Sequence, residues 1–138
     1  MGLDYGARTV GVALSDPLGL TAQSFEIIRR REENQLRPTL RRLQEIISEY
    51  DVREIVLGLP LNMDDSAGER AEKTLAFRTL LEKRVQLPVH MMDERLTSYA
   101  AEEAMTAAGI APKEQKRYVD RVAAAIILQD YMNAHGDN

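Results

Sequence analysis

Apolar and small residues alternate along much of the first thirty positions, and a period of two is typical of β-strands. Val10, Val12 and Leu14 show this alternation, with Gly11 and Ala13 between them. Turn-forming residues separate the apolar runs. The pattern therefore predicts a three-stranded antiparallel meander, with strands at 1–3, 8–15 and 21–28 and turns at 5–8 and 16–19.

Apolar residues take a helical spacing from Leu36 to Tyr50, and helical spacing returns later in the chain. Ser66, followed three residues on by Glu69, forms a capping box for a second helix. Thr97 or Ser98 is expected to cap a third. The spacing predicts four helices, over 36–50, from 66 to about 84, from 97 or 98 to about 109, and over 117–134.

Two continuous apolar runs, 54–59 and 87–92, lie between the predicted helices. Such runs are typical of central parallel strands that are covered on both faces. The order β-β-β-α-β-α-β-α-α predicts one α/β domain over 1–138, with a five-stranded mixed sheet flanked by helices. The sheet would combine the antiparallel meander with two parallel strands. Its parallel strands would end at one edge, which is where open α/β sheets bind ligands.

Acidic residues stand at three separate places that this fold could bring together. Asp4 follows the first apolar run, Asp93 and Glu94 follow the last, and Asp120 lies on the apolar final helix. A carboxylate in apolar surroundings is costly unless it is paired, protonated or bound to a cation. We therefore expect these acids to share a divalent metal. Because a strand turns successive side chains to opposite faces, only one of Asp93 and Glu94 should face the metal directly.

Each acidic position also has a plainer interpretation. Asp4 would be a solvated side chain in a turn, and Asp93 with Glu94 would pair with Arg95 at the end of a strand. Asp120 would lie at the rim and pair with a neighbouring cation, Lys116 or Arg121. For Gly6 the alternatives are a plain turn or a hairpin that binds phosphate, since glycine lets a ligand approach the backbone closely.

Composition narrows the class of protein. The chain has 44% hydrophobic and 29% charged residues and no cysteine, which excludes a disulfide framework and cysteine-ligated metals. Two histidines without ligand spacing make a histidine-rich metal site improbable. We find no apolar run long enough to span a membrane and no signal peptide, so we expect a cytoplasmic protein without a membrane partner.

The distribution of charge leaves nucleic-acid binding open. A net charge of −4 argues against it, because nucleic-acid-binding proteins are often basic. The basic residues nevertheless form two clusters, at 29–42 and at 113–121, which are either solvated faces or binding surfaces. Tyr118 and Tyr131 could stack on bases, although packing in the core or at its rim is the simpler interpretation.

Four segments together resemble the YqgF family, also called RuvX, within the ribonuclease H-like superfamily. The resemblance covers nearly the whole chain, and the four segments occur in the family's order. The set is specific, although any one segment is weak. The segments are Leu3-Asp4-Tyr5-Gly6-Ala7-Arg8-Thr9-Val10-Gly11-Val12-Ala13, Val56-Leu57-Gly58-Leu59-Pro60-Leu61-Asn62-Met63-Asp64, Asp93-Glu94-Arg95-Leu96-Thr97-Ser98 and Asp120-Arg121-Val122-Ala123-Ala124-Ala125-Ile126-Ile127-Leu128-Gln129.

The resemblance implies a ribonuclease H-like fold, with the first strand beside the fourth and fifth, and a nuclease that holds two Mg²⁺ or Mn²⁺ ions. Asp4 would bridge both ions and Asp120 would bind one. Glu94 would bind the other, with Asp93 as its alternate or support. The expected contacts to substrate come from Gly6, Asn62, Arg95, Lys116 and Arg117.

The resemblance also implies two substrates without choosing between them. One is precursor 16S ribosomal RNA, trimmed at its 5′ end, and we favour it. The other is a Holliday junction in branched DNA. A resolvase is expected to act as a homodimer, whereas a trimming enzyme could act as a monomer. Two other classes remain open, a phosphotransferase with an actin-like first phosphate loop and a non-catalytic RNA-binding factor of ribosome assembly.

Overall fold

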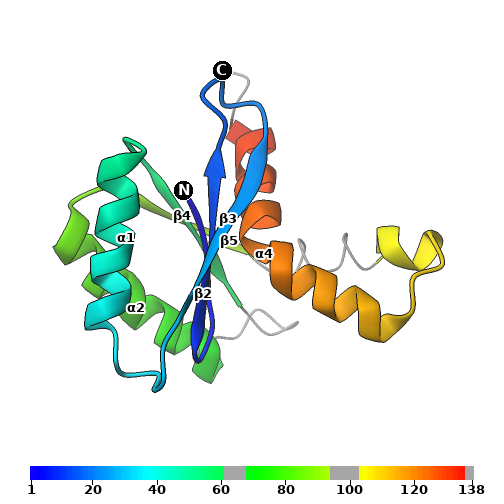
Figure 1. Ribbon diagram of the computed structural model, residues 1–138, viewed down its shortest axis with the longest axis horizontal. Coiled ribbons are helices and arrows are strands. Elements are labelled where there is room, and N and C mark those ends of the chain that lie inside the picture. The colour runs from blue at the N-terminus through cyan, green and yellow to red at the C-terminus, as the bar shows by residue number, and fades with distance from the viewer. Residues whose placement is uncertain (61–67, 94–102, 136–138) are drawn as a thin grey trace.

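A mixed β-sheet lies at the centre of the protein, seen in a computed structural model that describes residues 1–60, 68–93 and 103–135 (Figure 1). The described residues form five strands in the order β3-β2-β1-β4-β5. Their bounds are β1 (Gly2–Tyr5), β2 (Thr9–Ser15), β3 (Ala22–Arg29), β4 (Ile55–Leu59) and β5 (Val89–Asp93). The first three strands form the predicted antiparallel meander.

The parallel strands of the sheet have their carboxyl ends at the same edge. β1 pairs in parallel with β4, and β4 pairs in parallel with β5. The predicted common edge at the carboxyl ends of these strands is therefore confirmed. The expectation that the first strand lies beside both later strands holds only for β4, because β5 pairs with the far side of β4.

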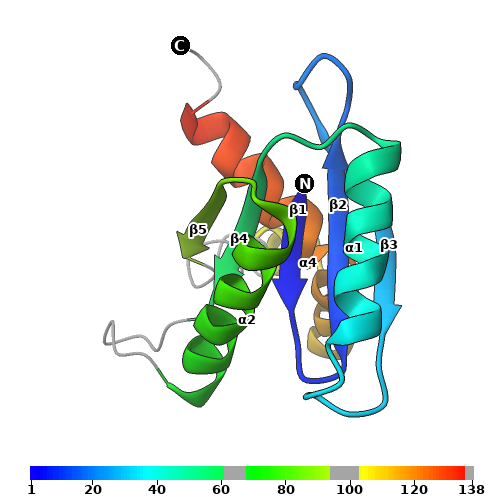
Figure 2. The same cartoon turned by 90° about the vertical axis from the view of Figure 1, so that its left-hand side faces the viewer.

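Helices cover both faces of the sheet, with α1 and α2 on one face and α4 on the other (Figure 2). Their bounds are α1 (Arg37–Glu49), α2 (Glu69–Val85) and α4 (Pro112–His135), and residues 103–107 are also helical. No helix within the described ranges is long and apolar enough to cross a membrane.

Two predicted helix starts are wrong. α2 begins at Glu69 after Gly68, whose extended backbone makes it the N-cap, so Ser66 does not cap this helix. Ser66, Thr97 and Ser98 themselves lie outside the described residues. The last helix begins at Pro112 rather than Arg117, because proline fits the first turn of a helix, where its missing N–H costs nothing.

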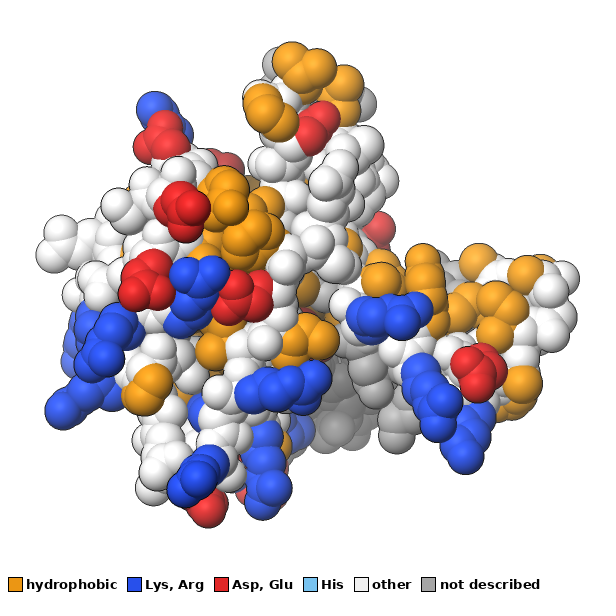
Figure 3. Space-filling model, viewed as in Figure 1, with side chains coloured by type: hydrophobic (Ala, Val, Ile, Leu, Met, Phe, Trp, Pro, Cys, Tyr) orange, Lys and Arg blue, Asp and Glu red, His pale blue; other side chains and the backbone are white. Residues whose placement is uncertain are grey.

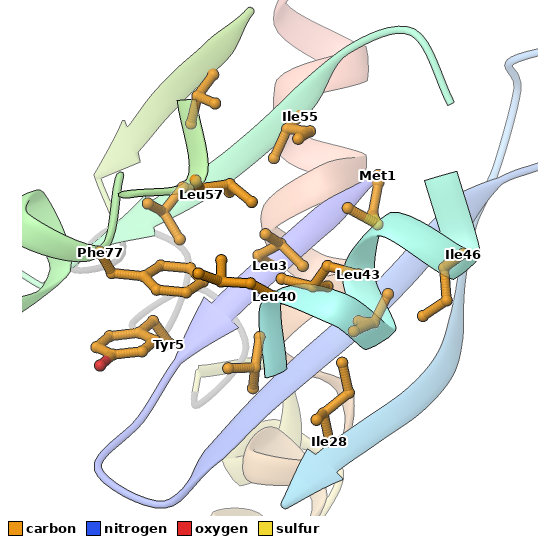
Figure 4. Close-up of a cluster of buried hydrophobic side chains, with 14 residues drawn as sticks. Met1, Leu3, Tyr5, Ile28, Leu40, Leu43, Ile46, Ile55, Leu57 and Phe77 are labelled. Carbon is orange, nitrogen blue, oxygen red and sulfur yellow. The ribbon is translucent and has the colours of Figure 1, made fainter. Parts of the chain in front are cut away.

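The main core fills the space between the sheet and the helices α1 and α2. Leu3 and Leu57 point to this side from neighbouring parallel strands, and each is fully buried. Leu43 of α1 and Phe77 of α2 meet them there (Figure 4). Burial of apolar side chains on this scale is the dominant stabilising contribution to such a domain.

A smaller core lies under α4 on the other face. Ala124 and Ile127 of α4 are buried there with Val56 of β4. Gly2 allows the helix to approach closely, because a Cβ on Gly2 would lie 2.7 Å from the carbonyl oxygen of Ala124 and 2.7 Å from Cβ of Leu128.

Candidate functional site

Asp4 lies within β1 and points to the face of the sheet that α4 covers. The strand was expected to end before Asp4, but it continues to Tyr5. Leu3 and Tyr5 face the main core, so alternation places Asp4 on the opposite face, where it is half-buried. Asp4 pairs in register with Gly11 of β2.

Gly11 leaves open space in front of Asp4. A Cβ on Gly11 would lie 3.7 Å from Cβ of Asp4 and 3.6 Å from Cβ of Ala124, both ordinary contact distances. The middle of α4, at Ala124, therefore stands next to Gly11 and Asp4. The space belongs to a cleft of about 610 Å³, which is lined by Asp4, Gly6, Thr9, Gly11, Ile27, Arg29, Arg117 and Arg121.

Three arginines make the cleft basic although the whole chain is acidic. Arg29 comes from β3, where it pairs in register with Thr9, and Arg117 with Arg121 come from α4. The two basic clusters of the sequence thus contribute to one cleft. Lys and Arg side chains lie on both sides of the hollow between the body and the lobe formed by the first half of α4 (Figure 3).

Among the described side chains, Glu114 is the acid that forms an ion pair with an arginine of the cleft. Arg117 approaches Glu114 at 3.7 Å, and both side chains are mostly exposed. Such a surface pair contributes little free energy, so a phosphate can replace it. Arg29 and Arg121 were not among the predicted site residues. The signal for Arg121 was its spacing of four from Arg117, which puts both on one helix face.

The turn after Asp4 is held from the opposite side of the sheet. Arg30 donates a hydrogen bond of 2.7 Å to the carbonyl oxygen of Gly6, and Arg70 of α2 donates one of 3.4 Å to that of Tyr5. The Tyr5 ring stacks on Phe77 with centroids 4.3 Å apart. Because these contacts fix Tyr5 and Gly6, they also restrict the backbone of Asp4.

An ion-pair network completes this support. Glu33 pairs with Arg70 and with Lys73, which joins the chain after β3 to helix α2. The Arg70 hydrogen bond first, and that from Lys73 second, hold the pKa of Glu33 below its ordinary value.

The other predicted acids are placed only in part. Asp93 ends β5, and because Met92 faces the α4 side, alternation places Asp93 on the opposite face from Asp4. That one member of the Asp93 and Glu94 pair faces the metal directly stays a prediction, because Glu94 lies outside the described residues. Asp120 belongs to α4 one turn before Ala124, the residue that borders Gly11.

Several predicted residues cannot be placed by their side chains. Asn62, Glu94 and Arg95 lie outside the described residues, as do the side chains of Lys116 and Asp120. Arg117 and Gly6 do line the cleft together with Asp4.

Carboxylate oxygens are suitable ligands for a hard divalent cation. Among the described side chains, which do not include that of Asp120, no group of three or more His, Cys, Asp or Glu could hold a metal ion. Among the described acids, Asp4 is the one that lines the cleft. Asp120 lies one helical turn before Ala124, which borders Gly11, the residue paired with Asp4. This position of the Asp120 backbone is compatible with a cation shared with Asp4.

Comparison with known proteins gives consistent results along the whole chain. The family model described as "RuvX: Holliday junction resolvase" matches residues 1–134. A protein of Lachnospira eligens named "Putative pre-16S rRNA nuclease" is 53% identical over 134 residues, which cover 97% of this chain and 96% of the relative. A protein of the same name from Listeria monocytogenes is 46% identical over 133 residues, covering 96% of each chain.

Solved structures support the fold assignment. The structure of Thermus thermophilus RuvC in complex with Holliday junction substrate superposes with a TM-score of 0.56 at 14% identity, covering 98% of this chain and 94% of the other. A second RuvC structure from the same organism gives a TM-score of 0.54 at 13% identity, with coverage of 98% and 95%. This likeness confirms the ribonuclease H-like α/β fold.

Proposed function

The chain belongs to the RuvX family, and from that premise we propose that it is a metal-dependent nuclease that hydrolyses phosphodiester bonds in precursor 16S ribosomal RNA. The observation that carries the proposal is the pairing of a half-buried carboxylate, Asp4, with three arginines in one cleft. Phosphate recognition needs the cations, and phosphodiester hydrolysis assisted by metal ions needs the carboxylate. The relatives' name supplies the substrate.

The acids would hold the metal ions at the edge of the sheet. Asp4 would bridge the ions, and Glu94 and Asp120 would each bind one, with Asp93 in a supporting role. When bound, two Mg²⁺ or Mn²⁺ ions supply an activated water and neutralise the charge that develops on the leaving oxygen. The fixed turn after Asp4 limits the motion of its carboxylate, and such pre-organisation lowers the cost of reaching the reactive geometry.

The basic residues would bind the phosphates that flank the scissile bond. Arg29 stands on β3, and Arg117 with Arg121 stands on α4, so a strand passing through the cleft would meet cations on both walls. Guanidinium groups suit this task because their planar donors match two phosphate oxygens. Asn62, Arg95, Lys116 and the backbone of Gly6 remain proposed contacts.

The second candidate substrate is branched DNA. The description of the family as Holliday junction resolvase favours it, whereas the name of the relatives favours RNA. We give more weight to the relatives, since they are 53% and 46% identical over nearly whole chains. Action on ribosomal RNA by a monomer in the cytoplasm is the version that we propose, and a homodimer is the form expected of a resolvase.

A comparison of substrates tests the proposal. Purified protein is incubated with precursor 16S RNA and with a four-way DNA junction, each with and without Mn²⁺. We expect cleavage of the RNA that requires the metal and that shortens its 5′ end. Cleavage of the junction alone would assign the resolvase activity. RNA binding without any cleavage would instead identify a non-catalytic assembly factor.

A further inference from the structure

Tyr118 has an environment unlike that of the tyrosines at the two cores. Its side chain is 48% exposed, on the part of α4 that extends beyond the sheet. Tyr5 is buried in the main core, and Tyr131 packs beside the smaller core with its ring 5.2 Å from that of His90. Packing against the smaller core therefore explains the position of the Tyr131 ring. The exposed ring of Tyr118 belongs to neither described core cluster.

Arg121 connects the Tyr118 ring to the cleft. Its guanidinium carbon lies 5.9 Å from the centroid of the ring, and Arg121 also lines the cleft that holds Asp4. A cation over the face of an aromatic ring is attracted to it, so this contact keeps the two side chains together. Arg117, one turn earlier on the helix, lines the same wall.

An exposed aromatic ring beside two arginines, Arg117 and Arg121, is a combination found in binding sites for single-stranded nucleic acid. In such sites cations follow the backbone and the ring stacks on a base, whatever its sequence. We propose that Tyr118 is a stacking site for an unpaired base, in a strand whose phosphates follow Arg117 and then Arg121 toward Asp4. A paired base inside a duplex is stacked on both faces and cannot use the ring, so this site selects single-stranded segments.

This inference rests on the proposed function for the direction of the strand, but it can be measured without cleavage. The probes are short single-stranded RNA and DNA oligonucleotides and the matching duplex, labelled with a fluorophore, in buffer with Ca²⁺ in place of Mg²⁺ or Mn²⁺. Tyr118→Ala should weaken binding of single strands by about fivefold to 150-fold, which corresponds to the 1–3 kcal/mol typical of one lost base–aromatic stack. Binding of the duplex should change less than about twofold.

Two further variants make the result specific. Tyr118→Phe keeps the ring and should bind single strands like the wild type. Tyr50→Ala removes a tyrosine of the same exposure, 48%, at the end of α1 on the other face of the sheet, and should leave binding unchanged. A 2-aminopurine base in the strand should lose fluorescence on binding to wild type and to Tyr118→Phe, but not to Tyr118→Ala.

Several outcomes would overturn the stacking site. They are unchanged binding by Tyr118→Ala, equal weakening of single strands and duplex, or no binding of single strands by the wild type. A change in the sedimentation of Tyr118→Ala with unchanged binding would assign the ring to an interface between two copies. Failure of the nuclease assay with a positive stacking result would remove only the proposed hydrolysis. Preference of the ring for RNA over DNA would be seen in the two single-strand arms.

Discussion

Replacement of Gly2 by alanine tests the contact on which the position of α4 depends. The new Cβ would lie 2.7 Å from the carbonyl oxygen of Ala124 and 2.7 Å from Cβ of Leu128. Both separations are far below van der Waals contact, and neither neighbour is the flexible end of a side chain. The helix must therefore move away from β1, and Arg117 and Arg121 must move with it.

The size of the effect follows from two opposing contributions. Overpacking a well-filled site costs about 1–3 kcal/mol, while alanine lowers the entropy of the unfolded chain and returns about 0.4–1 kcal/mol. The net loss for Gly2→Ala is about 0–2.6 kcal/mol, with a midpoint of about 1.3 kcal/mol. With an unfolding entropy of about 2.1 cal/mol/K per residue, the midpoint lowers Tm by roughly 4–5 °C.

Gly11→Ala is the matched control, because Gly11 lies under the same helix on the neighbouring strand. Its Cβ would meet Ala124 at 3.6 Å and Asp4 at 3.7 Å, which needs no movement. We expect Tm to rise by about 1–3 °C, from the entropy contribution alone. The added methyl group nevertheless fills space in front of Asp4, so nuclease activity should fall in a protein of undiminished stability.

Thermal unfolding followed by far-ultraviolet circular dichroism measures both variants, and cleavage of RNA is measured on the same samples. The expected result is a lower Tm for Gly2→Ala and a lower activity without loss of stability for Gly11→Ala. Equal Tm values for the two variants would refute the close approach of α4 to β1. Full activity of Gly11→Ala would show that substrate and metal do not use the space beside Asp4.

Three further predictions concern the core, the ion-pair network and the basic cleft. Phe77→Ala should lower the unfolding free energy in chemical denaturation by about 3–5 kcal/mol, because the ring is only 1% exposed. Glu33→Gln should destabilise the protein near neutral pH, and its difference from wild type should shrink as pH falls below 4.5, because the lowered pKa of Glu33 contributes stability only while the carboxyl group is ionised. A constant difference from neutral pH to pH 3 would contradict that reasoning. The double variant Arg117→Ala with Arg121→Ala should weaken single-stranded RNA binding and reduce the salt slope by about 1.4. Arg53→Ala, which removes an arginine that is 83% exposed in the turn before β4, is the control and should leave the slope unchanged.

The sequence predicts much of the fold because its strands and helices carry clear periods. Val10 and Val12 alternate with smaller residues, and both are buried in the structure. The apolar run before Leu59 is buried as well. Helix starts were predicted less well. Ser66 has the residue type of a cap, but the N-cap of α2 is Gly68, which has an extended backbone. Local residue preference competes there with tertiary structure, which the pattern does not contain.

The candidate site could be predicted only in outline. The carboxyl ends of parallel strands indicated the correct edge, and Asp4 does face the cleft. The contributions of Arg29 and Arg121 depend on how β3 and α4 come together across the sheet, and no local spacing encodes that distance. Sequence also left Tyr118 and Tyr131 equivalent, whereas one is exposed beside the cleft and the other packs near His90.

The central claim is that hydrolysis depends on the carboxylate of Asp4. The most direct measurement is the rate at which Asp4→Asn cleaves precursor 16S RNA with Mn²⁺, compared with the wild-type rate. An equal Tm of variant and wild type shows that the variant is folded. We expect cleavage to fall to background while RNA binding in Ca²⁺ persists, because the amide keeps the shape of the side chain but loses the charge that holds a cation. Cleavage at the wild-type rate by a folded Asp4→Asn protein would contradict it.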